Sequence, residues 1–161
     1  MDRPSWPQYF MEIAHVVAKR STCMRRQVGA VIVRDKQILS TGYNGAPKGL
    51  PHCEETGCIR QELNVPSGER HELCRAIHAE QNAIAQAAYN GVSLKDSTLY
   101  CTTAPCSLCA KMIINAGIKK VYYEGSYPDA RAMEYFRDAM IEVYQIVDGI
   151  AKLICYSGTC I

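Results

Sequence analysis

Residues 77–89 read I-H-A-E-Q-N-A-I-A-Q-A-A-Y, and residues 105–109 read P-C-S-L-C. The first stretch is rich in alanine, the best helix former, and predicts a helix that ends at the Asn-Gly pair at 90–91. The proline of the second stretch is typical of a first helical turn and predicts a helix over 106–116. Both predicted helices therefore begin with metal-ligating side chains.

Short apolar runs on either side of these helices predict strands. The runs at 29–33 and 38–43 are separated by polar residues, which predicts a hairpin. Strands that alternate with helices indicate an α/β layered sheet with this hairpin at its start. The other expected elements are strands at 98–102, 118–123 and 141–147 and helices at 5–20 and 128–140.

The composition is typical of one globular domain, with 161 residues of which 48% are apolar and 21% charged. The first residues lack the basic and then apolar run of a signal peptide. No apolar stretch approaches the ~20 residues of a membrane span, so we expect a cytoplasmic protein without membrane contact. The net charge of +2 gives no strong field for polymeric nucleic acid, which favours a small-molecule partner.

Four residues at the starts of the two predicted helices form a metal-binding pattern. Cys106 and Cys109 point the same way, and the helix dipole stabilises their thiolates, which are the form that zinc binds. With His78 they make three zinc ligands and leave a fourth tetrahedral position for water, as in a catalytic site. Zinc acidifies such a water, so Glu80, which faces another direction from His78, is the candidate proton shuttle.

Two plainer interpretations compete with catalysis. Cys106 and Cys109 alone would be typical of a structural zinc knuckle, and His78 alone of a core histidine with satisfied hydrogen bonds. A closed knuckle has no need of Glu80, and both halves of the pattern fall on neighbouring predicted helices. The combination of H-x-E with P-C-x-x-C is the signature of zinc-dependent nucleobase deaminases.

Longer motifs extend this pattern. The segments S-T-C-M-R-R-Q-V-G-A-V-I-V at 21–33, G-Y-N-G-A-P at 42–47 and H-A-E-Q-N-A-I at 78–84 resemble the cytidine and deoxycytidylate deaminase superfamily, in particular its deoxycytidylate deaminases. The resemblance implies a three-layer, cytidine-deaminase-like fold with a mixed five-stranded sheet and helices on both faces. It also implies a catalytic Zn²⁺ and hydrolysis of dCMP to dUMP and ammonia, which would supply dUMP for thymidylate synthesis.

The resemblance further implies substrate contacts. Asn44 would hydrogen-bond the sugar or base, Arg25 or Arg26 would neutralise the 5′-phosphate, and Ala79 and Tyr127 would line the pocket. For the arginines a solvated basic pair is the alternative, and for Tyr127 a turn aromatic that covers the core. Regulation by dCTP and dTTP and a homo-hexameric assembly are common in the family, and we expect both here.

Six more potential ligands lie outside the catalytic motif, mostly in residues 44–75, a segment too long for a bare loop. They are Cys23, Cys53, Cys58 and Cys74, with His52 and His71 beside them. We treat 44–75 as an insertion in a deaminase domain that spans 1–147 and is followed by a tail at 148–161. The resemblance implies that a second, structural Zn²⁺ clamps the insertion, with buried free thiols as the alternative. Its ligands would be Cys23 and Cys53, with two more from Cys58, His71 and Cys74.

Two other functions stay open at this point. The chain could deaminate another cytosine nucleoside or nucleotide, or a tRNA adenosine, because the short motifs are shared across such enzymes. It could instead be a non-catalytic nucleotide-binding accessory protein of a DNA-uptake system. The presence of Glu80 argues against the second alternative.

Overall fold

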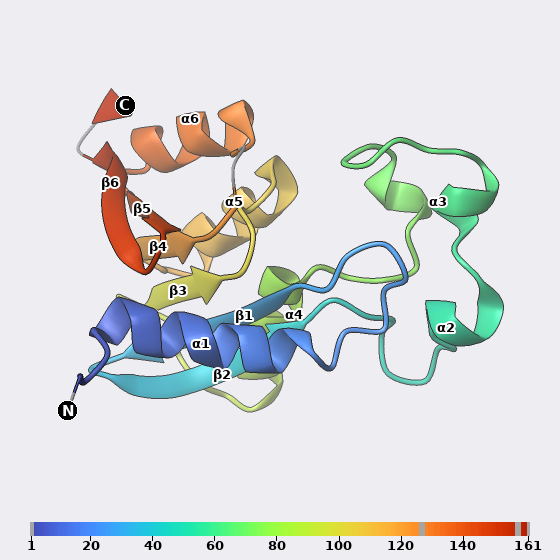
Figure 1. The fold of residues 1–161 in the computed structure, drawn as a ribbon, viewed down its shortest axis with the longest axis horizontal. Coiled ribbons are helices and arrows are strands. Elements are labelled where there is room, and N and C mark those ends of the chain that lie inside the picture. Colours follow the sequence, from blue (N-terminus) through green and yellow to red (C-terminus); the bar gives the residue numbers. More distant parts are fainter. Residues whose placement is uncertain (1, 126–127, 157–158, 161) are drawn as a thin grey trace.

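A mixed β-sheet forms the middle layer of the protein (Figure 1). The computed structural model describes residues 2–125, 128–156 and 159–160. Within these residues the sheet has seven strands in the order β2-β1-β3-β4-β5-β6-β7, of which β3, β4 and β5 are parallel. The strands are β1 (Gly29–Arg34), β2 (Gln37–Tyr43), β3 (Thr98–Cys101), β4 (Lys120–Tyr123), β5 (Glu142–Val147), β6 (Ile150–Tyr156) and β7 (Thr159–Cys160).

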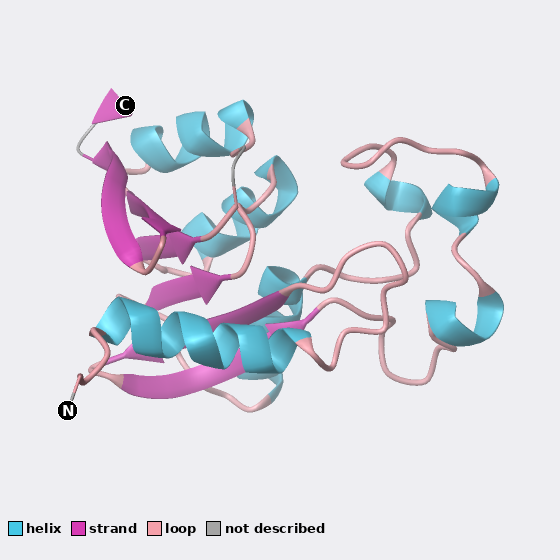
Figure 2. Ribbon diagram, in the orientation of Figure 1, coloured by secondary structure: helices cyan, strands magenta, loops and turns pink. Residues whose placement is uncertain are grey.

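Helices cover both faces of the sheet (Figure 2). Helix α1 (Trp6–Ala18) packs on one face, and α4 (Ala79–Tyr89), α5 (Ser107–Asn115) and α6 (Ala130–Asp138) pack on the other. The three-layer α/β architecture expected from the sequence is therefore confirmed. No helix of the described part of the chain combines the length and the apolar character needed to cross a membrane.

The sheet has seven strands rather than the five expected, because residues after 147 add β6 and β7. Asp148 and Gly149 have φ angles of 49° and 76°, the positive values that a type I′ hairpin turn requires of both central residues. The sequence V-D-G-I at 147–150 was thus a strong hairpin signal, and β5 pairs antiparallel with β6 around it. A domain boundary at residue 147 stays a prediction, although this pairing crosses it.

Helix α1 closes one face of the sheet with its apolar side. Ser5 caps the helix, since its Oγ accepts a hydrogen bond from the backbone N–H of Gln8 at 3.3 Å. Phe10 and Ala14 are buried in a cluster with Val31 of β1. The amphipathic pattern read from the sequence therefore places this helix correctly.

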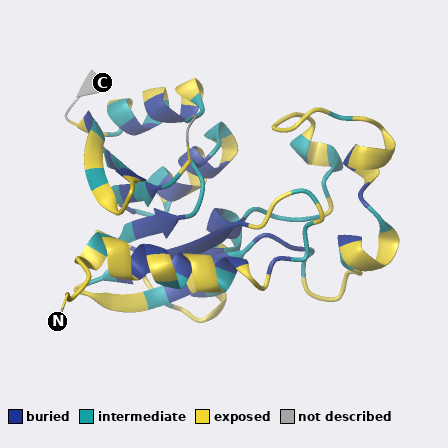
Figure 3. Cartoon of the chain, viewed as in Figure 1, coloured by how far each residue is buried: buried dark blue, intermediate teal, exposed yellow. Residues whose placement is uncertain are grey.

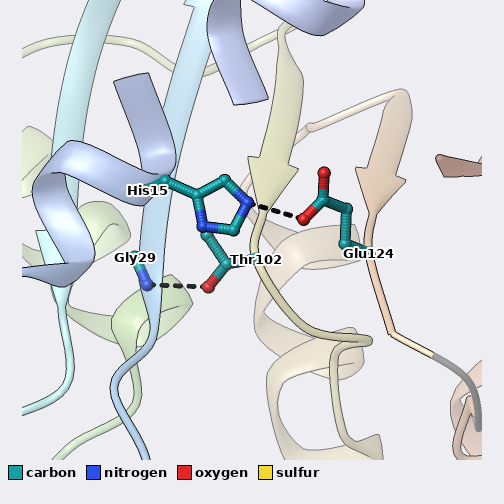
Figure 4. Close-up of polar contacts among 4 residues, drawn as sticks. All are labelled: His15, Gly29, Thr102 and Glu124. Carbon is teal, nitrogen blue, oxygen red and sulfur yellow. Dashed lines mark hydrogen bonds and ion pairs between the residues drawn. The ribbon is translucent and has the colours of Figure 1, made fainter. Parts of the chain in front are cut away.

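Two polar contacts fasten α1 and β1 to the strand ends beside them (Figure 4). His15 Nε2 lies 2.6 Å from Glu124 Oε2 and joins the last turn of α1 to the residue after β4. The backbone N–H of Gly29 donates to Thr102 Oγ1 at 3.1 Å and joins the start of β1 to the residue after β3. The first contact holds the start of the segment that follows β4, and the second holds the start of the segment that leads from β3 into α5.

Small residues bring α4 close to the sheet. Ala79, Ala83 and Ala87 are buried, and Gly42 of β2 faces the helix backbone. A Cβ atom on Gly42 would lie 2.3 Å from the carbonyl oxygen of Ala79 and 2.4 Å from the nitrogen of Ala83. The absence of a side chain at Gly42 therefore sets the distance between α4 and the sheet.

Residues 44–75 leave the sheet and form a separate lobe (Figure 1). The lobe contains α2 (Cys53–Thr56), α3 (Ile59–Glu62) and the 3₁₀ helix η1 (His71–Leu73), joined by loops. Gly45 and Ile77 exchange two backbone hydrogen bonds of 3.3 and 3.0 Å, which close the base of the lobe. Most of the lobe is exposed, in contrast to the buried sheet (Figure 3).

The packing at Gly42 predicts that Gly42→Ala destabilises the protein. The added methyl group would clash with the backbone of α4, so the free energy of unfolding in urea should fall by at least about 2 kcal/mol. Thr41→Ala, at an exposed position on the same strand, should change it by less than about 1 kcal/mol. Equal unfolding free energies for the two variants would contradict this account of α4.

Candidate active site

Three potential metal ligands meet where α4 and α5 begin. His78 directly precedes α4, Cys106 directly precedes α5, and Cys109 lies in the first turn of α5. His78 Nδ1 lies 3.2 Å from Cys109 Sγ and 3.5 Å from Cys106 Sγ. The three ligand atoms lie within 4.8 Å of one another, and no other such group exists among the described residues.

This donor set fits zinc. One imidazole nitrogen and two sulfur atoms supply three of the four ligands that zinc prefers in a tetrahedral arrangement. No fourth His, Cys, Asp or Glu from the described part of the chain joins the group. The site is therefore of the open type, which leaves one position for an exchangeable ligand, rather than of the closed structural type.

The two cysteines are electrostatically coupled. Hydrogen bonds from Cys109 and from His78 lower the pKa of Cys106 to about 4, whereas the hydrogen bond to Cys106 and burial raise the pKa of Cys109. The first thiolate forms readily near neutral pH, and the second loses its proton when a cation binds. The N-termini of α4 and α5 add to the stabilisation of negative charge on sulfur.

Glu80 lies in the first turn of α4 and is only 3% exposed. Burial raises the pKa of its carboxyl group, which suits a group that must both accept and release protons near neutral pH. Its side chain hydrogen-bonds with the thiol of Cys101, at the end of β3. Cys101 is fully buried, and burial raises the pKa of its thiol well above the ordinary value, so it stays a neutral hydrogen-bond donor.

Glu80 and two of the three ligands, His78 and Cys106, line a cavity of about 760 Å³. The starts of α4 and α5 form part of its wall, and residues 23–28 and the lobe form another part. This volume is in the range of pockets that bind small molecules, roughly 300 to 1,000 Å³. The lobe is therefore part of the site and not only an appendage of the fold.

Three arginines line this cavity, and none has an acidic partner among the described residues. Arg60 is 8% exposed; its Nη2 donates to the carbonyl of Pro66 at 3.3 Å, while its Nε is buried without a partner there. Arg25 Nη2 donates to the carbonyl of Val65 at 3.0 Å, and its Nη1 is buried and equally unpartnered. Arg26 is exposed. Buried, uncompensated cations are costly, so the cavity favours an anionic ligand.

Asn44 lines the cavity, but most of its side chain is already engaged. Its Oδ1 accepts from Ser21 Oγ at 2.6 Å and from the backbone N–H of Val28 at 2.9 Å. Its Nδ2 donates to the carbonyl of Arg26 at 2.8 Å. One of the four hydrogen-bonding positions of the amide is left for a ligand. Asn44 thus shapes the segment that carries the arginines, and it can make one further contact.

Ala79 also lines the cavity, whereas Tyr127 lies outside the described residues. The sequence analysis missed Arg60 and Asp129, which both line the cavity. Asp129 Oδ2 accepts from the backbone N–H of Ser107 at 2.9 Å and joins α6 to the start of α5. Asp129 precedes a helix and could have been found as an N-cap. A single arginine in an aperiodic segment gives no comparable signal.

Four of the five candidate ligands of a second metal site are cysteines, and the charges of three of them act on the fourth, Cys53; they are Cys23, Cys53, Cys58 and Cys74. Their sulfur atoms do not form a group as tight as that of His78, Cys106 and Cys109. Burial, and then the charges of the other three thiols, raise the pKa of Cys53. Three of the four line a smaller cavity of about 220 Å³. The fifth candidate, His71, instead contacts His78, with 3.3 Å between His71 Nδ1 and His78 Nε2.

The layered sheet, the open His-Cys-Cys site and the buried glutamate together define the class of cytidine-deaminase-like zinc proteins. The family described as "Cytidine and deoxycytidylate deaminase zinc-binding region" matches residues 4–125. The chain belongs to this family, and the metal that its site binds is Zn²⁺.

Individual relatives of known name resemble the chain over most of its length. The chain is 41% identical to the deoxycytidylate deaminase of Schizosaccharomyces pombe over 90% of its own length and 45% of that protein. It is 44% identical to ComE operon protein 2 of Bacillus subtilis, over 91% of this chain and 74% of that protein. The dCMP deaminase of cyanophage S-TIM5, solved in complex with dCMP and dUMP, is 31% identical with a TM-score of 0.72, over 91% of this chain and 100% of that one. The chain spans about half the length of the two yeast deoxycytidylate deaminases that it matches, 45% in each case.

Proposed function

We propose that the protein catalyses the zinc-dependent hydrolysis of dCMP to dUMP and ammonia. The observation that carries this proposal is the shared cavity: Glu80, His78 and Cys106 line the same pocket as Arg25 and Arg60. Each of these arginines has a buried nitrogen without a hydrogen-bond partner in the described part of the chain. A deaminating centre and a site for an anion thus lie within reach of one small molecule. The cyanophage relative, whose structure contains dCMP and dUMP, supports the same substrate.

The residues of the site divide the chemistry among them. His78, Cys106 and Cys109 would hold the zinc, which supplies a water acidic enough to lose its proton near neutral pH. Glu80 would take that proton and pass it to N3 of the cytosine as the base is attacked at C4. Glu80 would then take the remaining proton from the hydroxyl added at C4 and deliver it to the exocyclic amine, which leaves as ammonia while the C4 carbonyl of the uracil forms. Its burial keeps bulk water from competing for these protons.

Arg25 and Arg60 are best placed to bind the 5′-phosphate. Each already donates one hydrogen bond to a backbone carbonyl, which fixes the guanidinium, and each has a buried nitrogen left for a ligand. Charge-assisted hydrogen bonds from arginine match phosphate well. A nucleoside without a phosphate would leave a buried nitrogen of each arginine without a partner, so the pocket would select the monophosphate. The exposed Arg26 would strengthen the positive field at the cavity.

We also propose that residues 1–147 form a deaminase domain in which the lobe is an insertion. A second Zn²⁺ would clamp this lobe. Leu50, Ile59 and Leu63 of the lobe are 52%, 45% and 58% exposed, so the lobe has little hydrophobic core. Within residues 50–75 the buried side chains are instead two cysteines and one arginine. A segment with so few buried apolar groups needs another source of stability. Cys53 and the three cysteines whose charges act on it would supply the four ligands of a zinc ion.

A cytoplasmic homo-hexamer that responds to dCTP and dTTP is a further proposal, based on the family resemblance. One surface supports self-association. The rings of Tyr100, Tyr122 and Tyr144 stack across β3, β4 and β5, with centroids 4.8 and 4.6 Å apart. Helix α1 packs over β1, β2 and β3, so this stack continues past the helix onto a less covered part of the sheet. Aromatic side chains in such a position are well suited to contact another protein surface.

The role of Glu80 predicts that Glu80→Gln abolishes turnover but not zinc binding. Loss of a positioned acid and base should lower kcat for dCMP about 10²- to 10⁴-fold, measured as dUMP and ammonia formation. Zinc content should be unchanged, because the ligands are intact. Glu12→Gln, exposed on α1, should keep wild-type turnover. Unchanged turnover in Glu80→Gln would show that the proposed mechanism is wrong.

The anion site predicts that Arg60→Gln impairs the use of dCMP but not that of deoxycytidine, which lacks the phosphate. Loss of one charge-assisted contact should raise KM for dCMP roughly 10- to 100-fold. Residual turnover of deoxycytidine should stay at its wild-type level, which also reports on folding. Arg75→Gln, at an exposed position, is the matched control. A wild-type protein that turns over deoxycytidine as well as dCMP would rule out the monophosphate assignment.

The two metal sites predict two zinc ions per chain, counted by elemental analysis of the purified protein. Cys53→Ser should reduce the count to one and leave the catalytic zinc in place, and Cys109→Ser should also reduce it to one. Cys101→Ala removes a buried thiol that belongs to neither group and should keep two. A count of one in the wild type, lost only in Cys109→Ser, would exclude the second site.

A further inference from the structure

The side chain of His71 lies directly against that of His78. His71 Nδ1 is 3.3 Å from His78 Nε2, and the rings meet edge to face with centroids 4.8 Å apart and an interplanar angle of 76°. The other ring nitrogen of His78, Nδ1, faces the sulfur atoms of Cys106 and Cys109. His78 therefore directs one nitrogen to the metal site and the other to His71.

Zinc binding through His78 Nδ1 would select one tautomer in each ring. A neutral histidine that binds a metal through Nδ1 carries its hydrogen on Nε2. In His78 that hydrogen faces His71 Nδ1, which accepts it through its lone pair. His71 then carries its own hydrogen on Nε2. With this pair of tautomers the contact is a hydrogen bond from His78 to His71, and His78 Nδ1 is free to bind metal.

We propose that His71 is a positioning residue, which orients His78 for zinc through this hydrogen bond. The inference rests on the proposed function only in taking His78 as a zinc ligand. A partner on the second nitrogen fixes the ring of a metal-bound histidine and strengthens metal binding. A neutral imidazole does this without adding negative charge next to two thiolates and Glu80.

The place of His71 in the chain gives the contact a second consequence. His71 begins η1 near the end of the lobe, and it lines the main cavity together with Arg60. The lobe thus supplies both a residue for the anion and the residue that holds a zinc ligand. The order of the lobe and the zinc affinity of the site are coupled through His71.

The test compares His71→Ala, which removes the acceptor, with His71→Asn, whose Oδ1 stands close to the place of Nδ1. Zinc affinity is measured on the full chain by equilibrium competition with a chromophoric chelator. Cys109→Ser is titrated in parallel, and the zinc equivalent that this variant fails to bind is the one that belongs to the site of His78. We expect zinc to bind roughly 10- to 100-fold more weakly to His71→Ala and within about threefold of wild type to His71→Asn. Glu69→Ala, exposed two residues earlier, should bind zinc like the wild type.

Turnover adds a second readout. In zinc-saturated His71→Ala, kcat for dCMP should fall while KM stays unchanged, because His71 acts through His78. Wild-type zinc affinity in His71→Ala would overturn the inference. An equal loss of affinity in His71→Asn would also overturn it, because the residue would then act through packing alone. If the wild type binds zinc but does not deaminate dCMP, the proposed substrate fails while the affinity comparison still tests His71.

Discussion

A zinc site of this kind requires three ligand atoms within a few ångströms, and in this chain they come from two helix starts 28 residues apart. That requirement is met because α4 and α5 lie on the same face of the sheet and begin at the same place. Gly42 and the alanines of α4 allow the close approach of the helix. Asp129 holds the start of α5 from the side of α6. The metal geometry therefore depends on backbone packing as much as on the ligands.

Opposite charges reach the cavity from different parts of the chain. The helix starts contribute two cysteine sulfurs and the carboxyl group of Glu80, which are suited to a metal and to proton transfer. The segment after α1 and the lobe contribute guanidinium groups without acidic partners. Under the proposed function, this separation would let one small anionic molecule satisfy the arginines while its other end meets the metal. It also explains why the lobe, which buries little apolar surface, is part of the site.

The elements with regular hydrophobic patterns were predictable, because period and capping residues are local properties of the sequence. Helices α1, α4, α5 and α6 and strands β1 to β5 all lie close to the expected positions. Strand β6 was missed although its turn, at 148–149, carried a clear signal. The lobe has no period at all, so neither its short helices nor its contacts with the metal site could be read from the pattern.

The sequence by itself determined the chemistry of the site, because H-x-E and P-C-x-x-C at helix starts carry the metal ligands and the glutamate at fixed local spacings. Only the tertiary structure decided which distant residues meet that site. It brought Arg60 into the cavity, engaged most of the side chain of Asn44 within the chain, and placed His71 against His78 rather than among the four cysteines. The physical reason is that these contacts depend on where the lobe lies relative to the starts of α4 and α5. Burial, the lack of acidic partners and the orientation of rings arise only from that placement, and no periodic pattern along the chain records them.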